Sequence, residues 1–294
     1  MRSLGRLAAL RSKLHLPVVK RATGLLEGRH RSVFTGHGQD FDDMVDYHPG
    51  DDPSDIDWKT SARVGHPVIK RFQRETNLSL ILAVDTGRNM AAAAPSSETK
   101  AEVAQFAAQV LIFLARGRGD LVGAVTGDAE RLTQLPAKQG LAHTEAILSR
   151  IADQMSLAAP EPDLNRVLAR TLTSVTRRSL VAVITDQAHP GMESELELRR
   201  LLTRHEVMMV RVADMIPAQV ERGAVVDVSG GELPAFLRRD PVITREAAAL
   251  VAQRTAQTSQ MLRTLGIEQV TVDGSDGVVD ALVDLLGRQR RVHR

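Results

Sequence analysis

From residue 78 onward, the sequence alternates short apolar, β-branched runs with longer stretches of helical period. Runs that are apolar throughout are typical of strands buried on both faces of a sheet, and their alternation with helices is typical of a parallel sheet. The predicted strands are residues 78–84, 121–126, 180–185, 207–212, 224–228 and 267–272, and the predicted helices are residues 97–116, 141–155, 163–176, 193–204, 243–265 and 276–288. This order predicts an α/β fold with a doubly wound, mainly parallel sheet of the Rossmann type, covered by helices on both faces.

Residues 1–77 have a different character. They are rich in Gly, Asp and Arg and show little sustained helical period. We therefore predict two domains: an irregular, partly β N-terminal subdomain at residues 1–77 and the α/β domain at residues 78–290. Charge is segregated within the first, since residues 1–31 carry eight Lys or Arg and one acid, whereas residues 40–57 carry eight Asp and no Lys or Arg.

Composition excludes several classes of site. The chain has no cysteine, so disulfides, thiolate metal sites and cysteine nucleophiles are excluded. A net charge of +2, with one Trp, one Tyr and six Phe, argues against nucleic-acid binding. No run approaches the roughly 18 apolar residues of a membrane helix, and the N-terminal apolar run is too short for a signal peptide. We expect a cytoplasmic protein without a membrane span. An alternative is that basic residues 1–24 bind an anionic membrane surface, which would recruit the protein peripherally, or nucleic acid.

Two of the predicted strands end in a carboxylate, Asp85 and Asp186. In a doubly wound sheet, ligands bind beyond the carboxyl ends of the strands, so these two side chains are candidates for a shared site. Two converging carboxylates suit Mg²⁺, which prefers oxygen ligands. The alternative is that each aspartate caps the helix that follows it.

Residues 40–52 contain a second group of carboxylates, which includes Asp42, Asp43, Asp51 and Asp52. Clustered Asp residues can bind Ca²⁺, or a transition metal together with a histidine. The spacing here is not that of an EF-hand loop, which favours a solvated acidic face or a docking patch for a basic partner. Asp52 before Pro53 also predicts a helix start.

The single Tyr and the single Trp of the chain, Tyr47 and Trp58, both lie in this N-terminal region. One interpretation is an aromatic anchor that docks an irregular segment; the other is a binding site.

No phosphate-binding loop, zinc-binding helix motif or nucleophile elbow is present in the sequence. The sequence thus contains no nucleophile, base or cofactor motif of those kinds.

The stretch from Tyr47 to Trp58, with Tyr-His-Pro-Gly-Asp-Asp followed by Ile-Asp-Trp, carries a resemblance to a known family. Together with Leu26 to Arg31, Ser61 to Arg63, Pro67 to Lys70 and Leu80 to Asp85, it resembles the MoxR-associated family of domain of unknown function 58. The resemblance is ordered and nearly full length. The region after residue 78 resembles a von Willebrand factor type A domain, which implies the same doubly wound sheet.

Domains of that type often carry a metal-ion-dependent adhesion site, and the resemblance implies a degenerate form of it here. Asp85 and Asp186 match the two acidic positions of that site. Gly87 stands at the first serine position and Asn89 at the second, while Pro162 falls near the threonine position. Gly87 and Pro162 supply no side-chain oxygen, so we expect no cofactor, with Mg²⁺ held by Asp85, Asn89 and Asp186 as the alternative.

The family resemblance implies a non-enzymatic adaptor that acts with a MoxR-type AAA+ ATPase in chaperone-like assembly or activation of a client protein complex. The alternative is a divalent-metal-dependent hydrolase that uses Asp85 and Asp186 to activate water. An interpretation left open for Gly87 is that it lets a partner's backbone approach closely. The candidate partner-binding residues are Asp42, Asp43, Tyr47, Asp51, Asp52, Asp57, Trp58, Asp85, Gly87, Asn89 and Asp186.

Overall fold

The computed structural model describes residues 35–48, 53–73, 79–220 and 224–292. The chain divides into two compact units, one formed by residues 27–77 and the other by the rest of the chain. Each unit is described by itself below. Among the described residues, no helix combines the length and the apolar character needed to cross a bilayer.

The first unit contains an antiparallel pair of strands, β1 (Thr35–Asp46) and β2 (Val68–Gln73). A short 3-10 turn, η1 (Pro53–Asp55), and the helix α3 (Trp58–Val64) lie between them in the sequence. The helix start predicted at Pro53 is therefore a single 3-10 turn. The longer helix begins after Asp57, whose carboxylate caps it by accepting hydrogen bonds from the backbone N–H groups of Lys59 (3.1 Å) and Thr60 (3.3 Å).

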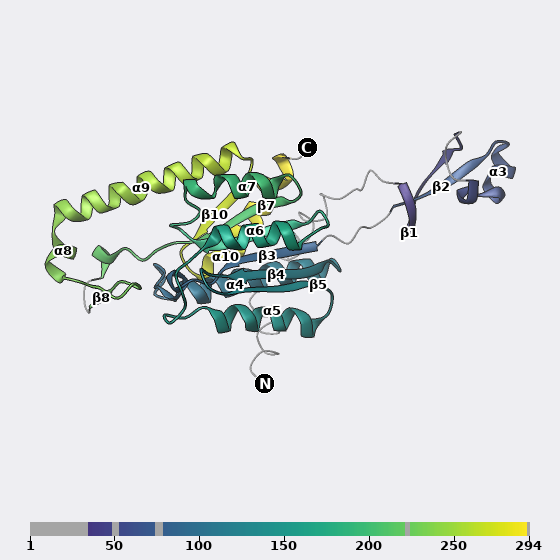
Figure 1. The fold of residues 1–294 in the computed structure, drawn as a ribbon. Helices are drawn as coiled ribbons and strands as arrows, with labels where there is room; N and C mark the ends of the chain where they lie inside the picture. Colours follow the sequence, from purple (N-terminus) through teal and green to yellow (C-terminus); the bar gives the residue numbers. More distant parts are fainter. Residues whose placement is uncertain (1–34, 49–52, 74–78, 221–223, 293–294) are drawn as a thin grey trace. The chain divides into compact units, whose positions relative to one another are not determined.

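The second unit is built on a six-stranded sheet with the order β10-β7-β6-β3-β4-β5 (Figure 1). Its strands are β3 (Ser79–Asp85), β4 (Leu121–Gly127), β5 (Leu132–Lys138), β6 (Leu180–Asp186), β7 (Glu206–Val212) and β10 (Glu268–Val272). All neighbouring pairs are parallel except β4 and β5, which are antiparallel. The predicted α/β fold with a mainly parallel, doubly wound sheet is confirmed.

Helices cover both faces of this sheet, as Figure 1 shows. They are α4 (Lys100–Gly117), α5 (Leu141–Gln154), α6 (Leu164–Ser174), α7 (Glu195–Leu202), α9 (Pro241–Thr264) and α10 (Ser275–Val292). One hydrophobic core joins the sheet to α4, α5 and α10, and a second joins it to α6, α7 and the C-terminal end of α9. Side chains of successive residues on a strand point to opposite faces of the sheet, so Leu82 of β3 enters one core and Ala83 enters the other.

The chain changes direction across the sheet between β3 and β6. From β3 it continues to β4 and β5 on one side, and it then returns to β6 on the other side of β3. Such a switch point leaves a crevice at the carboxyl ends of the two strands, which is where open α/β sheets bind ligands. Asp85 and Asp186 are the last residues of β3 and β6, so both lie at this switch point.

Two parts of the sheet differ from the sequence prediction. β5 was not predicted because its residues are half polar, include Pro136, and lie at a partly exposed edge, so they give no continuous apolar run. The strand predicted at residues 224–228 is wrong as a member of the main sheet. Only Val225–Val226 (β8) is extended there, and it pairs with Glu232–Leu233 (β9) in a small separate hairpin.

Candidate functional site

Asp85 and Asp186 are joined at the ends of their strands by one amide side chain. The Nδ2 group of Asn89 donates to Asp85 Oδ2 (3.1 Å) and to Asp186 Oδ2 (2.9 Å). Asn89 belongs to η2 (Arg88–Ala91), the 3-10 turn that follows β3. The structure therefore brings together the three residues for which the sequence suggested a metal site, and an N–H donor faces both carboxylates.

The carboxylate of Asp85 is surrounded by donors from its own chain. Oδ1 accepts the backbone N–H of Gly87 (2.9 Å), and Oδ2 accepts the hydroxyl of Thr185 (3.1 Å) in addition to Asn89. Asp85 is completely buried. Its carboxylate thus both closes the turn after β3 and bonds across to β6, a broader role than the local capping considered from the sequence.

Asp186 forms an ion pair with a buried lysine. The ammonium of Lys100 lies 3.1 Å from Asp186 Oδ2 and also pairs with Asp214 Oδ1. Lys100 is the first residue of α4, and its side chain is only 2 % exposed. Asp214 follows β7 by two residues and is partly open to solvent, with a side chain 43 % exposed. The lysine therefore pairs with two carboxylates, one buried in the interior and one partly exposed at the surface.

A histidine completes the surroundings of Asp186. His189 lies three residues after it, and both its backbone N–H (3.2 Å) and its Nδ1 (2.8 Å) contact Asp186 Oδ1. One oxygen of Asp186 thus faces His189, while the other faces Asn89 and Lys100. We name Asp85, Asn89, Lys100, Asp186, His189 and Asp214 the strand-end cluster.

The charges of the strand-end cluster influence one another. Burial raises the pKa of Asp85. Burial opposes ionisation of Asp186 as well, but hydrogen bonding to His189 and the charge of Lys100 outweigh it and hold the pKa of that carboxyl below its usual range. Burial lowers the pKa of Lys100, yet Asp186 and Asp214 more than offset this, so its pKa is raised. The cluster therefore favours an ionised Asp186 paired with a charged Lys100.

Gly87 is required by a close approach from within the same chain. A Cβ atom at this position would lie 2.5 Å from Pro162 Cα and 2.7 Å from Pro162 N. The loop around Pro162 is fixed to the turn after β3, because the backbone N–H of Arg88 donates to Pro160 O (2.9 Å) and the Arg88 guanidinium pairs with Glu161 (2.9 Å). The backbone that approaches Gly87 thus belongs to this chain, whereas the sequence had left room for a partner's backbone there.

These side chains do not fit a resident Mg²⁺ ion. Such an ion requires oxygen donors, and here the Nδ2 of Asn89 and the ammonium of Lys100 occupy the space beside Asp186 Oδ2. Gly87 and Pro162 contribute no side-chain oxygen. Among the described residues, no group of three His, Asp or Glu side chains is arranged to hold a metal ion.

The candidate residues of the first unit are placed differently. Trp58 is 69 % exposed, so it is not an anchor within its own unit. Tyr47 is half-buried, and its backbone N–H donates to Pro67 O (2.9 Å). Asp57 is the cap of α3. Two further candidates, Asp42 and Asp43, lie on β1, with Asp43 opposite Arg71 of β2 in the register. The remaining two, Asp51 and Asp52, lie outside the described residues.

Sequence reasoning missed Lys100, His189 and Asp214. A signal existed for Lys100, since a cation in the first turn of a helix is disfavoured by the helix dipole and needs a compensating partner. Asp214 comes just after a predicted strand, as Asp85 and Asp186 do. His189 follows Asp186 by three residues, close enough to fold back on it.

A second feature of this unit is the segment inserted between β7 and β10, which we name the arm (residues 214–256). It contains β8, β9, the short helix α8 (Ala235–Arg239) and the N-terminal part of α9, and Figure 1 shows α8 at the end of α9 that is remote from the sheet. Residues 245–254 of α9 are exposed throughout. The large exposed apolar side chains of the arm are Ile216, Val226, Phe236, Val242, Ile243, Leu250 and Val251.

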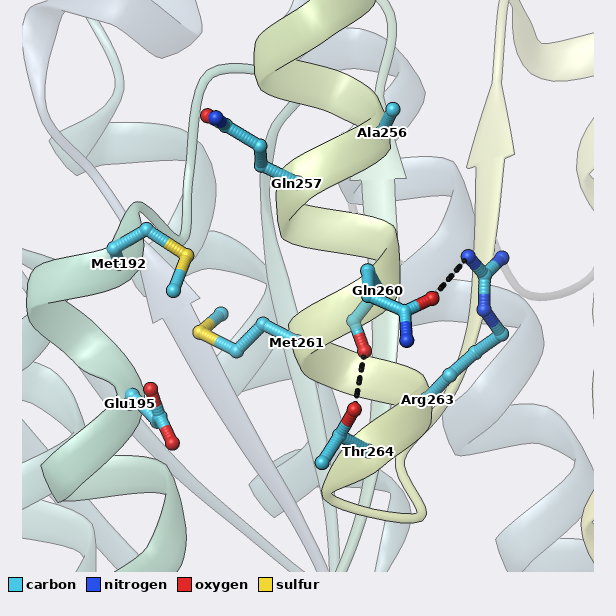
Figure 2. A pocket seen from close by; sticks show the side chains of 8 residues that line it. All are labelled: Met192, Glu195, Ala256, Gln257, Gln260, Met261, Arg263 and Thr264. Atoms are coloured by element: carbon cyan, nitrogen blue, oxygen red, sulfur yellow. Dashed lines mark hydrogen bonds between the residues drawn. The ribbon is translucent and has the colours of Figure 1, made fainter.

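A groove of about 660 Å³ lies where α9 returns to the sheet. Figure 2 shows its lining, with Met192 and Glu195 on one side and the C-terminal half of α9 on the other. Met192 is exposed, whereas Met261 is buried. The groove therefore combines two methionine side chains with mostly polar residues.

Comparisons with known proteins agree with the resemblance read from the sequence. The profile of the family described as protein of unknown function DUF58 matches residues 43–257. The chain is 27 % identical to the uncharacterized proteins Mb1516 of Mycobacterium bovis and Rv1480 of Mycobacterium tuberculosis. Each of these alignments covers 97 % of this chain and 90 % of the relative.

Solved structures also show similarity to the chain. One is an aerotolerance-related membrane protein from Bacteroides fragilis, with a TM-score of 0.44, 15 % identity, and coverage of 72 % of this chain and 99 % of that protein. Another is a von Willebrand factor type A protein from Catenulispora acidiphila, with a TM-score of 0.42, 10 % identity, and coverage of 73 % and 42 %. Because these TM-scores are below 0.5, the fold assignment rests on the strand order of the sheet itself.

Proposed function

The chain belongs to the DUF58 family of proteins of unknown function. We propose that it is a protein-interaction module that binds its partner through the arm. The observation that carries this proposal is the exposed apolar surface of α8 and α9. Phe236 is 72 % exposed, and Leu250 and Val251 are each about half exposed, within a stretch of α9 whose residues 245–254 are all exposed. Large exposed apolar side chains that gather on one segment are typical of interaction sites.

The charge of α8 and of the N-terminal part of α9 indicates the chemistry of the partner. Residues 234–256, which form this part of the arm, carry four Arg and two acidic residues, so positive charge exceeds negative charge in the segment that carries Phe236, Leu250 and Val251. A complementary partner presents an apolar surface bordered by carboxylates. We propose a MoxR-type AAA+ ATPase as this partner and chaperone-like assembly or activation of a client complex in the cytoplasm as the process, following the family resemblance.

The strand-end cluster supports a non-enzymatic function over the hydrolase alternative. A hydrolase requires carboxylates that hold metal ions or a free base that activates water. Here Asp85 already accepts three hydrogen bonds, and Asp186 is occupied by Asn89, Lys100 and His189. Both carboxylates are therefore used to hold the chain's own strand ends together.

The test is the affinity of the purified chain for the purified ATPase of the same organism. Phe236→Ser combined with Leu250→Ser removes two exposed apolar side chains of the arm, one from α8 and one from α9. We expect this variant to bind at least about tenfold more weakly than the wild type, as central apolar contacts usually dominate an interface. A matched control is Leu157→Ser, which removes a side chain 68 % exposed outside the arm, and it should bind like the wild type.

The possible results separate the parts of the proposal. If the variant with Phe236→Ser and Leu250→Ser bound the ATPase as tightly as Leu157→Ser does, the proposal that the arm is the binding surface would be contradicted. If the wild type failed to bind the ATPase, the choice of partner would be contradicted. Metal-dependent phosphatase or nuclease activity that is lost in Asp85→Ala would favour the hydrolase instead.

A further inference from the structure

We propose that the ammonium of Lys100 takes the place of a divalent cation beside Asp186 at the carboxyl end of β6, and that it ties the first residue of the arm, Asp214, to the sheet. The inference concerns how the cluster and the arm are held together, and it does not depend on which partner the arm binds.

Geometry supports the first half of this inference. Asp85, Asn89 and Asp186 converge at the switch point of the sheet, where a metal ion would compensate two buried carboxylates. Lys100 Nζ lies 3.1 Å from Asp186 and also contacts Asp214, so a cation already pairs with one of the two buried carboxylates, while Asn89 joins Asp186 to Asp85. Unlike a metal ion, this cation is covalently attached to the chain and cannot dissociate from it.

The position of Lys100 in the helix shows that the carboxylates hold it there. It is the first residue of α4, after the cap Thr99, where the helix dipole disfavours positive charge. A lysine that served only the helix would extend into solvent from this turn. Instead its side chain is buried, and its ammonium reaches carboxylates that follow β6 and β7.

Hydrogen bonds connect the same region to both ends of the arm. At its first residue, the backbone N–H of Asp214 donates to Gln187 Oε1 (3.4 Å), and that of Met215 donates to Ala93 O (3.1 Å). At its return, Gln187 Nε2 donates to Thr255 of α9 (3.2 Å). Gln187 is adjacent to Asp186 in the sequence, so the turn held by Lys100 also contacts the arm where it leaves the sheet and where it returns.

Two measurements on the full-length protein test the inference. Electron paramagnetic resonance with Mn²⁺ as the probe should show no stoichiometric binding to the wild type. Hydrogen exchange followed by mass spectrometry should show faster exchange of residues 213–216 in Lys100→Met, by at least about tenfold, because the amides at the base of the arm lose their support. The matched control is Lys138→Met, which removes an exposed lysine of β5 and should leave this exchange unchanged.

A second variant keeps the test decisive if Lys100→Met does not fold. Asp214→Asn removes only the charge on the arm side and leaves the Lys100–Asp186 pair in place, so it should fold and show the same faster exchange. Stoichiometric Mn²⁺ binding by the wild type that disappears in Asp186→Asn would overturn the first half of the inference. Unchanged exchange at residues 213–216 in the folded variants would overturn the second half.

Discussion

The ammonium of Lys100 lies 3.1 Å from the carboxylate of Asp186, and both side chains are almost completely buried. A buried ion pair contributes little net stability compared with apolar residues of equal volume, because both ions lose their hydration. Loss of one partner is nevertheless costly, since it leaves the other charge buried and uncompensated. We therefore infer that this pair holds the last residue of β6 and the first residue of α4 in one arrangement, and that it adds little to the net stability.

Lys100→Met should lower the free energy of unfolding by about 3–5 kcal/mol, the usual cost of breaking a buried ion pair from one side. Asp186→Asn should have a cost of similar size. The double variant should be less destabilised than the sum of the two single variants, because it buries no isolated charge. Urea denaturation of the four proteins measures this coupling, and strictly additive effects would contradict a direct interaction.

Gly87→Ser restores a side-chain oxygen at the position where the adhesion site of similar domains has serine. We expect it to destabilise the protein by about 1–3 kcal/mol, because its Cβ would lie 2.5 Å from Pro162 Cα and the loop has to move. Gly277→Ala in α10 is the matched control, since a Cβ there meets nothing within 4 Å and the helix gains stability. A stable Gly87→Ser variant would show that Pro162 does not limit this position.

His189 should stabilise the native state most at low pH. Burial lowers the pKa of its imidazole, but the hydrogen bond and charge of Asp186 outweigh this and raise it above 6.5. Because the raised pKa belongs to the folded state, its contribution is complete below the unfolded pKa and is lost as the pH rises through the folded pKa. The stability difference between wild type and His189→Gln should therefore be larger near about pH 6 than near about pH 8.5. An unchanged difference would exclude the charged pair.

Trp58→Ala should leave the protein folded with nearly wild-type stability, since this side chain is 69 % exposed. Asp57→Ala should cost about 1 kcal/mol in the first unit, because it removes the cap of α3. Thermal denaturation followed by circular dichroism checks both variants. Unfolding of Trp58→Ala would contradict the exposed position and support an anchor.

Much of the α/β unit follows from the sequence alone. Apolar runs predicted the buried strands β3, β4, β6 and β7, and a β-branched run predicted the edge strand β10. The rule that ligands bind at strand ends led to Asp85 and Asp186. The convergence of these two aspartates requires β3 and β6 to be neighbours, and they are neighbours because the chain changes direction across the sheet there, although β4 and β5 lie between them in the sequence. Local pattern and general topology were sufficient for this part of the cluster.

The rest of the cluster depends on tertiary contacts that no local pattern encodes. Lys100 reaches Asp186, which lies 86 residues further along the chain, and Asp214, which lies 114 residues further. Gly87 is constrained by Pro162, which approaches it from another loop. The exposure of Trp58 was also not predictable, because an aromatic side chain in an irregular region fits an anchor and a surface residue equally well.

The central claim is that the arm binds the protein partner. A photo-crosslinking amino acid placed at position 236 in cells, with the same substitution at position 157 as control, tests it most directly. We predict that the residue at position 236 crosslinks to the AAA+ ATPase and that the residue at position 157 does not. Crosslinking to the ATPase from position 157 alone, or equally from both positions, would contradict the claim.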